Sequence, residues 1–266
     1  MARKLGDNRY TQIFRKIFLA HYKKGVEEMA FDREEMVGAA RELGIALPKN
    51  IGDLIYSFRY RTAFPDDMAA KAPAGKHWII RPAGRGKYAI VAVVPVEIKP
   101  NELMAETRIP DATPGVIAMY ALNDEQALLA KVRYNRLIDI FTGITCYSLQ
   151  SHLRTALSVG QVETDELYVG VDKKGAQFVL PVQAKGGRDR LNIVQIEQDF
   201  ALCEAKFPAL ICLPIAAQFL GDELIALFRF EKSEGAVKIS SEKHYRLVPG
   251  EKMTEQDVAE QNRRLD

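Results

Sequence analysis

The sequence lacks the features that mark a secreted or membrane protein. It has only three cysteines, an odd number, and no Cys-x-x-Cys pair, so we expect buried free thiols rather than disulfides. The apolar stretch 207–220 is too short to span a bilayer and contains Pro208 and Pro214. The charged N-terminus has no apolar signal-peptide core. We therefore expect a cytoplasmic protein with no membrane partner.

The motifs of several common enzyme classes are also absent. The four histidines are scattered without the spacing of metal ligands. The segment 84–87 (Gly-Arg-Gly-Lys) lacks the frame of a phosphate-binding P-loop. There is no G-x-S-x-G sequence and no dinucleotide-binding fingerprint. These absences argue against histidine-metal, nucleotide-hydrolysing, serine-hydrolase and dinucleotide-dependent chemistry.

Charge is present in nearly equal amounts of both signs but is unevenly distributed. The net charge is +2, yet residues 1–100 hold 18 Lys and Arg against 11 Asp and Glu, and residues 101–266 hold 19 against 24. A basic N-terminal part attracts phosphate backbones. The imbalance mildly favours a nucleic-acid partner for that part.

The N-terminal pattern predicts helices over 9–25, 33–43 and 50–61, followed by two strands, 76–81 and 87–93, joined at a glycine-rich turn. We expect Asp32 to be the N-cap of the second helix. Three helices followed by a two-stranded hairpin with a basic tip resemble a winged helix-turn-helix DNA-binding domain, which we place at residues 1–99. The alternative is a small α+β domain that does not bind DNA. The resemblance implies DNA contacts near the helix ends and the hairpin tip by Lys49, Asn50, Arg59, Tyr60, Arg61, Arg85 and Lys87.

The rest of the chain is predicted to form a linker, a second domain and a tail. Residues 100–118, rich in proline and without clear periodicity, are the expected linker, and residues 251–266 form a charged tail. Between them, over 119–250, we predict a helix from Asn123 or Asp124 to Phe141 and a second helix through 147–157. Strands are predicted at 163–171 and 177–184, a helix at 192–206, and further strands at 209–214 and 224–231.

One hairpin in this second domain has the composition of a nuclease site. Glu163-Thr164-Asp165-Glu166 opens its first strand, and Val182-Gln183-Ala184-Lys185 ends its second. The pattern resembles the PD-(D/E)XK nuclease superfamily, which includes many restriction endonucleases and junction resolvases. In that family an acidic residue lies on one strand and a (D/E)-x-K motif on its neighbour. The Q-x-K variant is similar to the form found in methylation-dependent restriction nucleases of the Mrr type. The resemblance implies an α/β fold with a restriction-endonuclease-like mixed sheet flanked by helices.

Simple geometry supports a catalytic role for this hairpin. Residues i and i+2 of a strand share a face, so Gln183 and Lys185 project together, and strand pairing brings Asp165 or Glu166 beside them. Oxygen ligands from Asp165, Glu166, Glu163 and Gln183 would hold Mg²⁺, with Mn²⁺ as an alternative. The metal lowers the pKa of a bound water and stabilises charge on phosphate, and Lys185 would orient or deprotonate that water. The candidate catalytic residues are Lys185, Gln183, Glu166 and Asp165.

Gln183 departs from the family pattern, because an amide replaces the usual carboxylate. Asp124 and Glu125 at the start of the preceding helix are further acidic candidates, since such helices supply ligands in some family members. Arg188 and Arg190, after the motif, are candidates for phosphate contacts. A second E-x-K sequence at 97–99 is followed by proline-rich chain and lacks the expected context.

The sequence thus predicts a Mg²⁺-dependent endonuclease acting on double-stranded DNA, of the type II restriction class. We expect a homodimer, because two-fold protein symmetry matches palindromic sites. Two alternatives stay open: a repair or junction-resolving nuclease, and a non-catalytic DNA-binding regulator with a degenerate nuclease fold.

Overall fold

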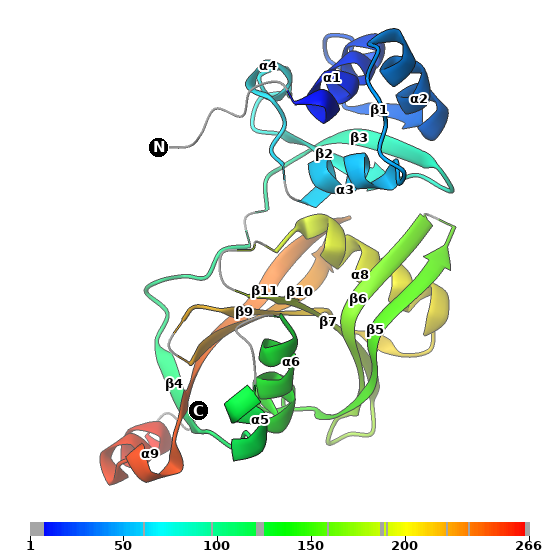
Figure 1. Ribbon diagram of the computed structural model, residues 1–266. Coiled ribbons are helices and arrows are strands. Elements are labelled where there is room, and N and C mark those ends of the chain that lie inside the picture. The colour runs from blue at the N-terminus through cyan, green and yellow to red at the C-terminus, as the bar shows by residue number, and fades with distance from the viewer. Residues whose placement is uncertain are drawn as a thin grey trace. The chain divides into compact units, whose positions relative to one another are not determined.

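The computed structural model describes residues 8–60, 62–96, 98–120, 125–158, 160–186, 189, 191–221, 223–233 and 235–263. The chain divides into two compact units (Figure 1). Unit 1 holds the residues up to 96 together with 156–161, and unit 2 holds 97–155 and 162–266. Among the described residues, no helix is both long and apolar enough to cross a membrane.

Unit 1 combines short helices with a three-stranded antiparallel sheet. The predicted helices and hairpin are present, although the first helix ends at His21 rather than near residue 25. The sheet order is β1-β3-β2, and its first strand was not predicted. The elements are α1 (Arg9–His21), β1 (Glu28–Asp32), α2 (Arg33–Glu42), α3 (Gly52–Tyr60), α4 (Asp66–Ala69), β2 (His77–Pro82) and β3 (Lys87–Val93).

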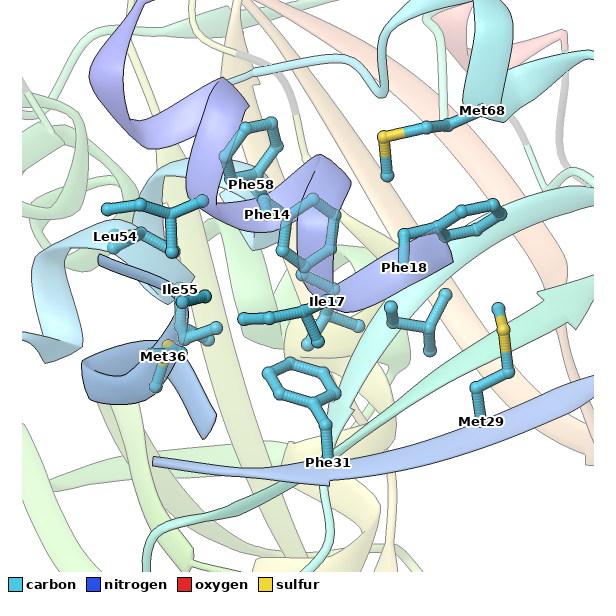
Figure 2. Packing of buried hydrophobic residues seen from close by; sticks show 14 of the residues in the cluster. Phe14, Ile17, Phe18, Met29, Phe31, Met36, Leu54, Ile55, Phe58 and Met68 are labelled. Carbon is cyan, nitrogen blue, oxygen red and sulfur yellow. The ribbon is translucent and has the colours of Figure 1, made fainter. Parts of the chain in front are cut away.

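An aromatic core holds unit 1 together. Phe14 of α1 stacks on Phe58 of α3 with ring centroids 4.4 Å apart, and both side chains are buried. Figure 2 shows these rings beside Phe31 of β1 and Leu54 of α3. The start of α2 is fixed as predicted, because Asp32 caps it in a reciprocal hydrogen-bonded box.

Unit 2 is built on an eight-stranded mixed sheet flanked by helices. The strand order is β4-β11-β10-β9-β7-β6-β5, with β8 paired to β7. β7 runs parallel to β8 and β9, and β4 runs parallel to β11, whereas β6–β7, β9–β10 and β10–β11 are antiparallel. The elements are β4 (Glu106–Pro110), α5 (Gly115–Tyr120), α6 (Glu125–Tyr134), α7 (Leu137–Thr142), β5 (Thr145–Leu157), β6 (Gly160–Val171), β7 (Gln177–Lys185), α8 (Ile193–Lys206), β8 (Ile211–Cys212), β9 (Ile215–Phe219), β10 (Leu224–Ser233), β11 (Ala236–Val248), a 3₁₀ turn (Gly250–Lys252) and α9 (Glu255–Asn262).

The two faces of this sheet pack against different helices. Leu180 and Val182 of β7 belong to a cluster with Leu128 and Val132 of α6. Val179 of the same strand packs instead with Cys203 of α8. Because successive strand residues point to opposite faces, α6 and α8 cover opposite sides of the sheet. Both faces of β7 are therefore buried against a helix.

The structure differs from the sequence predictions at several elements of unit 2. Residues 147–157, predicted to be helical, belong to the long strand β5. The expected linker 100–118 contributes β4 to the sheet and contains the start of α5. The strand predicted at 209–214 is the two-residue β8, while β9 and β11 were not predicted. The charged tail contains α9. Asp257 of this helix forms an ion pair of 2.7 Å with Arg108 of β4.

The tip of the β5–β6 hairpin, residues 156–161, is grouped with unit 1. A Cβ placed on Gly160 would lie 3.3 Å from Cβ of Pro82, at the end of β2. Gly160 also has a φ of +121°, a region that favours glycine. The close approach and the backbone angle together explain a glycine at this position.

Candidate functional site

The candidate site lies where β6 and β7 separate. Their paired residues run from Val171 with Gln177 to Glu166 with Val182. Beyond that point β7 continues in parallel register with β9, as far as Lys185 opposite Gln218. Where the two strands diverge, side chains from β6, β7, α6 and α8 make the hydrogen bonds.

Three charged residues from three elements meet at the end of β7. A carboxylate oxygen of Asp165 on β6 accepts a hydrogen bond of 2.8 Å from the backbone N–H of Ala184. Lys185 Nζ donates to Ala184 O at 2.8 Å and to Glu125 Oε1 of α6 at 2.6 Å. The structure thus brings together Asp165 and Lys185 with Glu125 at the first turn of α6, and all three were candidates in the sequence.

The electrostatics of this group favour an added positive charge. Burial raises the pKa of Asp165 above its ordinary value, and the nearby Glu125 and Glu163 raise it further. The Ala184 N–H and the Lys185 ammonium lower that pKa, but less strongly than burial raises it. Lys185 is itself mostly buried, with its side chain 13% exposed. A partly desolvated carboxylate beside two others gains free energy when a cation arrives.

Gln183 was expected to bind metal, but its side chain is hydrogen bonded to other protein groups. It is 1% exposed, and both ends of its amide are already hydrogen bonded. Its Nε2 donates to Asp199 Oδ1 and Oδ2 at 3.0 and 3.1 Å and to Glu163 O at 3.2 Å. Its Oε1 accepts from Gln195 Nε2 at 3.1 Å. In this structure the amide therefore connects β7 to β6 and to α8.

Asp199 is the residue that the sequence analysis missed. It lies in the middle of α8, it is 1% exposed, and burial raises its pKa well above the ordinary value. Its neighbours are Gln183 and the Thr164 side chain. One signal was available in the sequence: Gln195 and Asp199 are four residues apart in a predicted helix, so they share a face otherwise filled by apolar side chains.

Glu166, the other carboxylate expected beside Gln183 and Lys185, has partners of its own on α6 and β5. Its side chain is fully buried, and Oε1 accepts from Arg133 Nε at 2.9 Å and from Ser148 Oγ at 2.5 Å. It is therefore paired with Arg133 near the end of α6 and with Ser148 of β5, whereas Lys185 is paired with Glu125 at the start of α6. Glu163 forms an ion pair of 2.9 Å with Arg154 of β5 and contributes its backbone carbonyl to Gln183. The partners of both glutamates thus differ from those expected of a ligand beside Lys185.

The acidic groups here are sparse for a metal centre made by protein alone. Within the described parts of the chain, no group of three or more His, Cys, Asp and Glu has the arrangement to hold a metal ion. Mg²⁺ requires less than this, because it keeps several waters and binds through one or two carboxylates together with substrate phosphate. Asp165 and Glu125 are two carboxylates close enough for one to influence the pKa of the other.

The candidate DNA-contacting residues of unit 1 lie around α3 and the β2–β3 turn. Lys49, Arg85 and Lys87 are exposed. Asn50 precedes α3, where its side chain accepts from Gly52 N at 3.1 Å. Arg59 lies over the rings of Tyr60 and Tyr88, at 5.6 and 5.8 Å from their centroids. The remaining candidates Arg61, Arg188 and Arg190, and Asp124, lie outside the described residues.

Comparisons with known proteins give no relative: no protein-family model, no curated protein and no solved structure matches this chain.

Proposed function

We propose that the chain is a metal-dependent DNA endonuclease of the restriction type, with its catalytic site at the diverging ends of β6 and β7. The observation that supports this most directly is the meeting of Asp165, Lys185 and Glu125, supplied by two strands and a helix. A strand pair that ends in an acid and a lysine, flanked by helices on both faces, is the arrangement that the PD-(D/E)XK resemblance implies.

Lys185 is the proposed catalytic residue. Its ammonium is held between Glu125 and the Ala184 carbonyl, which fixes its position at the end of β7. From there it can donate to a phosphate oxygen as negative charge develops, or hold an attacking water. Because its side chain is mostly buried, the charge acts with less screening by solvent than a surface lysine would.

Asp165 and Glu125 are the residues proposed to hold Mg²⁺, with Mn²⁺ as a substitute. When bound, the ion would supply a water of lowered pKa and neutralise phosphate charge. The chain contributes two carboxylates, and burial raises the pKa of one of them, Asp165, despite the nearby Lys185 ammonium. The Ala184 N–H fixes one oxygen of Asp165 by its hydrogen bond.

Unit 1 is the proposed DNA-reading part. Its order of helices followed by a β2–β3 hairpin with exposed Arg85 and Lys87 is the order expected of a winged helix-turn-helix. Exposed cations at a hairpin tip favour contacts with phosphates. A homodimer acting on a palindromic site belongs to the same proposal, because restriction enzymes of this class match two-fold DNA with two-fold protein.

The test is cleavage of plasmid DNA by the purified protein with and without Mg²⁺. We expect Lys185→Ala to abolish cleavage while DNA affinity and unfolding temperature stay near those of the original protein. Lys174→Ala, in the exposed turn between β6 and β7, is the matched control and should cleave normally. The substrates should include methylated, unmethylated and branched DNA, so that a junction-resolving or modification-dependent nuclease is also detected.

A second candidate function is a DNA-binding regulator without catalysis. One observation favours it: Gln183, where the motif calls for a carboxylate, is an amide with both ends engaged. Specific DNA binding with no cleavage of any substrate, in Mg²⁺ or Mn²⁺, would replace the nuclease by this regulator.

A further inference from the structure

Past the pairing of Glu166 with Val182, side chains bridge β6 and β7. Thr164 Oγ1 donates to Val182 O at 3.3 Å, Gln183 Nε2 donates to Glu163 O at 3.2 Å, and Ala184 N donates to the Asp165 carboxylate at 2.8 Å. These bridges, rather than the regular ladder, therefore set the spacing between Asp165 and Lys185.

Gln183 is the bridge that also reaches α8. Its NH₂ group faces both oxygens of Asp199, and its carbonyl oxygen faces the NH₂ group of Gln195. All these groups are buried or partly buried. A donor or acceptor left unpaired there would lower stability, because water cannot reach it to replace the lost hydrogen bond. The donors and acceptors match when residue 183 presents its NH₂ group toward Asp199.

A carboxylate at position 183 would reverse this match. The oxygen in place of Nε2 would face both oxygens of Asp199 and the carbonyl of Glu163, so that acceptors would meet acceptors. The other oxygen would still accept from Gln195 Nε2. The departure of Gln183 from the usual D/E-x-K pattern thus has a structural partner 16 residues along the chain.

We propose that Asp199 is a positioning residue of the site: with Gln195 it orients the Gln183 amide, and through Gln183 it holds the separated ends of β6 and β7 at the spacing that Asp165 and Lys185 require. This inference rests on the proposed nuclease function for its catalytic consequence. Its structural half, the donor–acceptor match between residues 183 and 199, stands on the hydrogen bonds alone.

The match can be tested by exchanging the two chemical groups. Gln183→Glu should lower the unfolding midpoint and reduce cleavage at saturating DNA by at least about tenfold, since buried acceptors are left unpaired. Adding Asp199→Asn should restore the pairing between residues 183 and 199, because an amide at position 199 can donate to the new carboxylate while Gln195 donates to its other oxygen. We expect the double variant to cleave at least about threefold faster than Gln183→Glu alone, but short of the original rate, because the hydrogen bond to Glu163 O stays broken.

The matched control is Gln177→Glu, the same chemical change at the exposed opposite end of β7. It should leave both the unfolding midpoint and cleavage unchanged. Cleavage is measured well below the unfolding midpoint, together with the Mg²⁺ concentration for half-maximal rate. The rise in unfolding midpoint on adding Mg²⁺ gives a second readout that does not depend on activity.

The outcomes separate the two proposals. If Gln183→Glu lowers stability but the folded variant cleaves and responds to Mg²⁺ as the original does, Asp199 is structural only and the positioning role is wrong. If the double variant is no better than Gln183→Glu alone, the match itself is wrong. If the original protein cleaves no DNA, the nuclease proposal fails, and the Mg²⁺-dependent midpoint of the three variants still decides whether Asp199 acts on the site.

Discussion

At the scale of single residues, the acids of β6 have separate partners that follow from strand alternation. Asp165 reaches the end of β7, whereas the next residue, Glu166, is buried against Arg133 on the α6 side. The sequence pointed to Lys185 and Asp165, because an acid and a lysine at strand ends form a recognisable pattern. It could not assign the partners of Glu166 or of Asp199, since their contacts depend on which helix covers which face.

The Glu166–Arg133 pair gives a prediction about stability. Arg133→Met should lower the free energy of unfolding by about 2–3 kcal/mol, because a fully buried carboxylate is left without its charged partner. The loss is smaller than for a fully buried pair, since the Arg133 side chain is 42% exposed. Urea unfolding measures it. Combining Arg133→Met with Glu166→Gln should recover part of the loss, and equal stability of Arg133→Met and the original protein would contradict the prediction.

At the scale of elements, β5 shows why the helix prediction at 147–157 was wrong. Leu149, Leu153 and Leu157 are spaced by four, which suits a helix, but four is also an even number and therefore suits one face of a strand. Helices with apolar residues at both i+3 and i+4, such as α1 and α3, were predicted because only a helix fits that mixture. Residues 147–157 form a strand because they pair with β6 in the folded sheet. Such pairing involves a second segment, so the sequence of one segment does not reveal it.

Two glycines, Gly170 in β6 and Gly38 in α2, differ in the space around them, and alanine should therefore affect stability in opposite directions. A Cβ on Gly170 would lie 2.6 Å from Ile144 Cγ2 and 3.0 Å from Cys146 Sγ, so Gly170→Ala should cost about 1–3 kcal/mol through overpacking. A Cβ on Gly38 in α2 would have no atom within 4 Å, so Gly38→Ala should stabilise by about 0.5–1 kcal/mol. Thermal unfolding of the two variants checks both signs, and a stabilising Gly170→Ala would be inconsistent with this packing.

The junction between β4 and α6 predicts a dependence on pH. Burial raises the pKa of Asp111, but hydrogen bonds from Thr113 and Asn135 outweigh it, and the pKa lies below its ordinary value. A lowered carboxylate pKa contributes stability above the unfolded-state pKa of about 3.9, and this contribution is lost as pH falls. The difference in unfolding free energy between the original protein and Asp111→Asn should be largest near neutral pH and shrink below about pH 4. A difference independent of pH would refute this assignment.

At the scale of the whole molecule, the uneven charge predicts how salt affects DNA binding. Replacing Arg85 and Lys87 by Ala should weaken DNA affinity and reduce the slope of log affinity against log salt by about two, because each cation neutralises one phosphate. Cleavage at saturating DNA should change little, since neither residue belongs to the β6–β7 site. Titrations at several salt concentrations measure the slope, and replacing the similarly charged pair Lys173 and Lys174 should leave it unchanged. An unaltered slope in the Arg85–Lys87 variant would remove unit 1 from the DNA-binding proposal.

The grouping of residues 156–161 with unit 1 limits how the gene for this protein can recombine with other genes. The chain passes between the units three times, after residues 96, 155 and 161. A recombination event that replaced only the gene segment before residue 97 would leave Gly160 facing a foreign neighbour in place of Pro82. The two units therefore cannot be exchanged between genes as independent, continuous segments. A replacement for unit 1 would have to arrive together with a matching hairpin tip, encoded in the middle of the segment for unit 2.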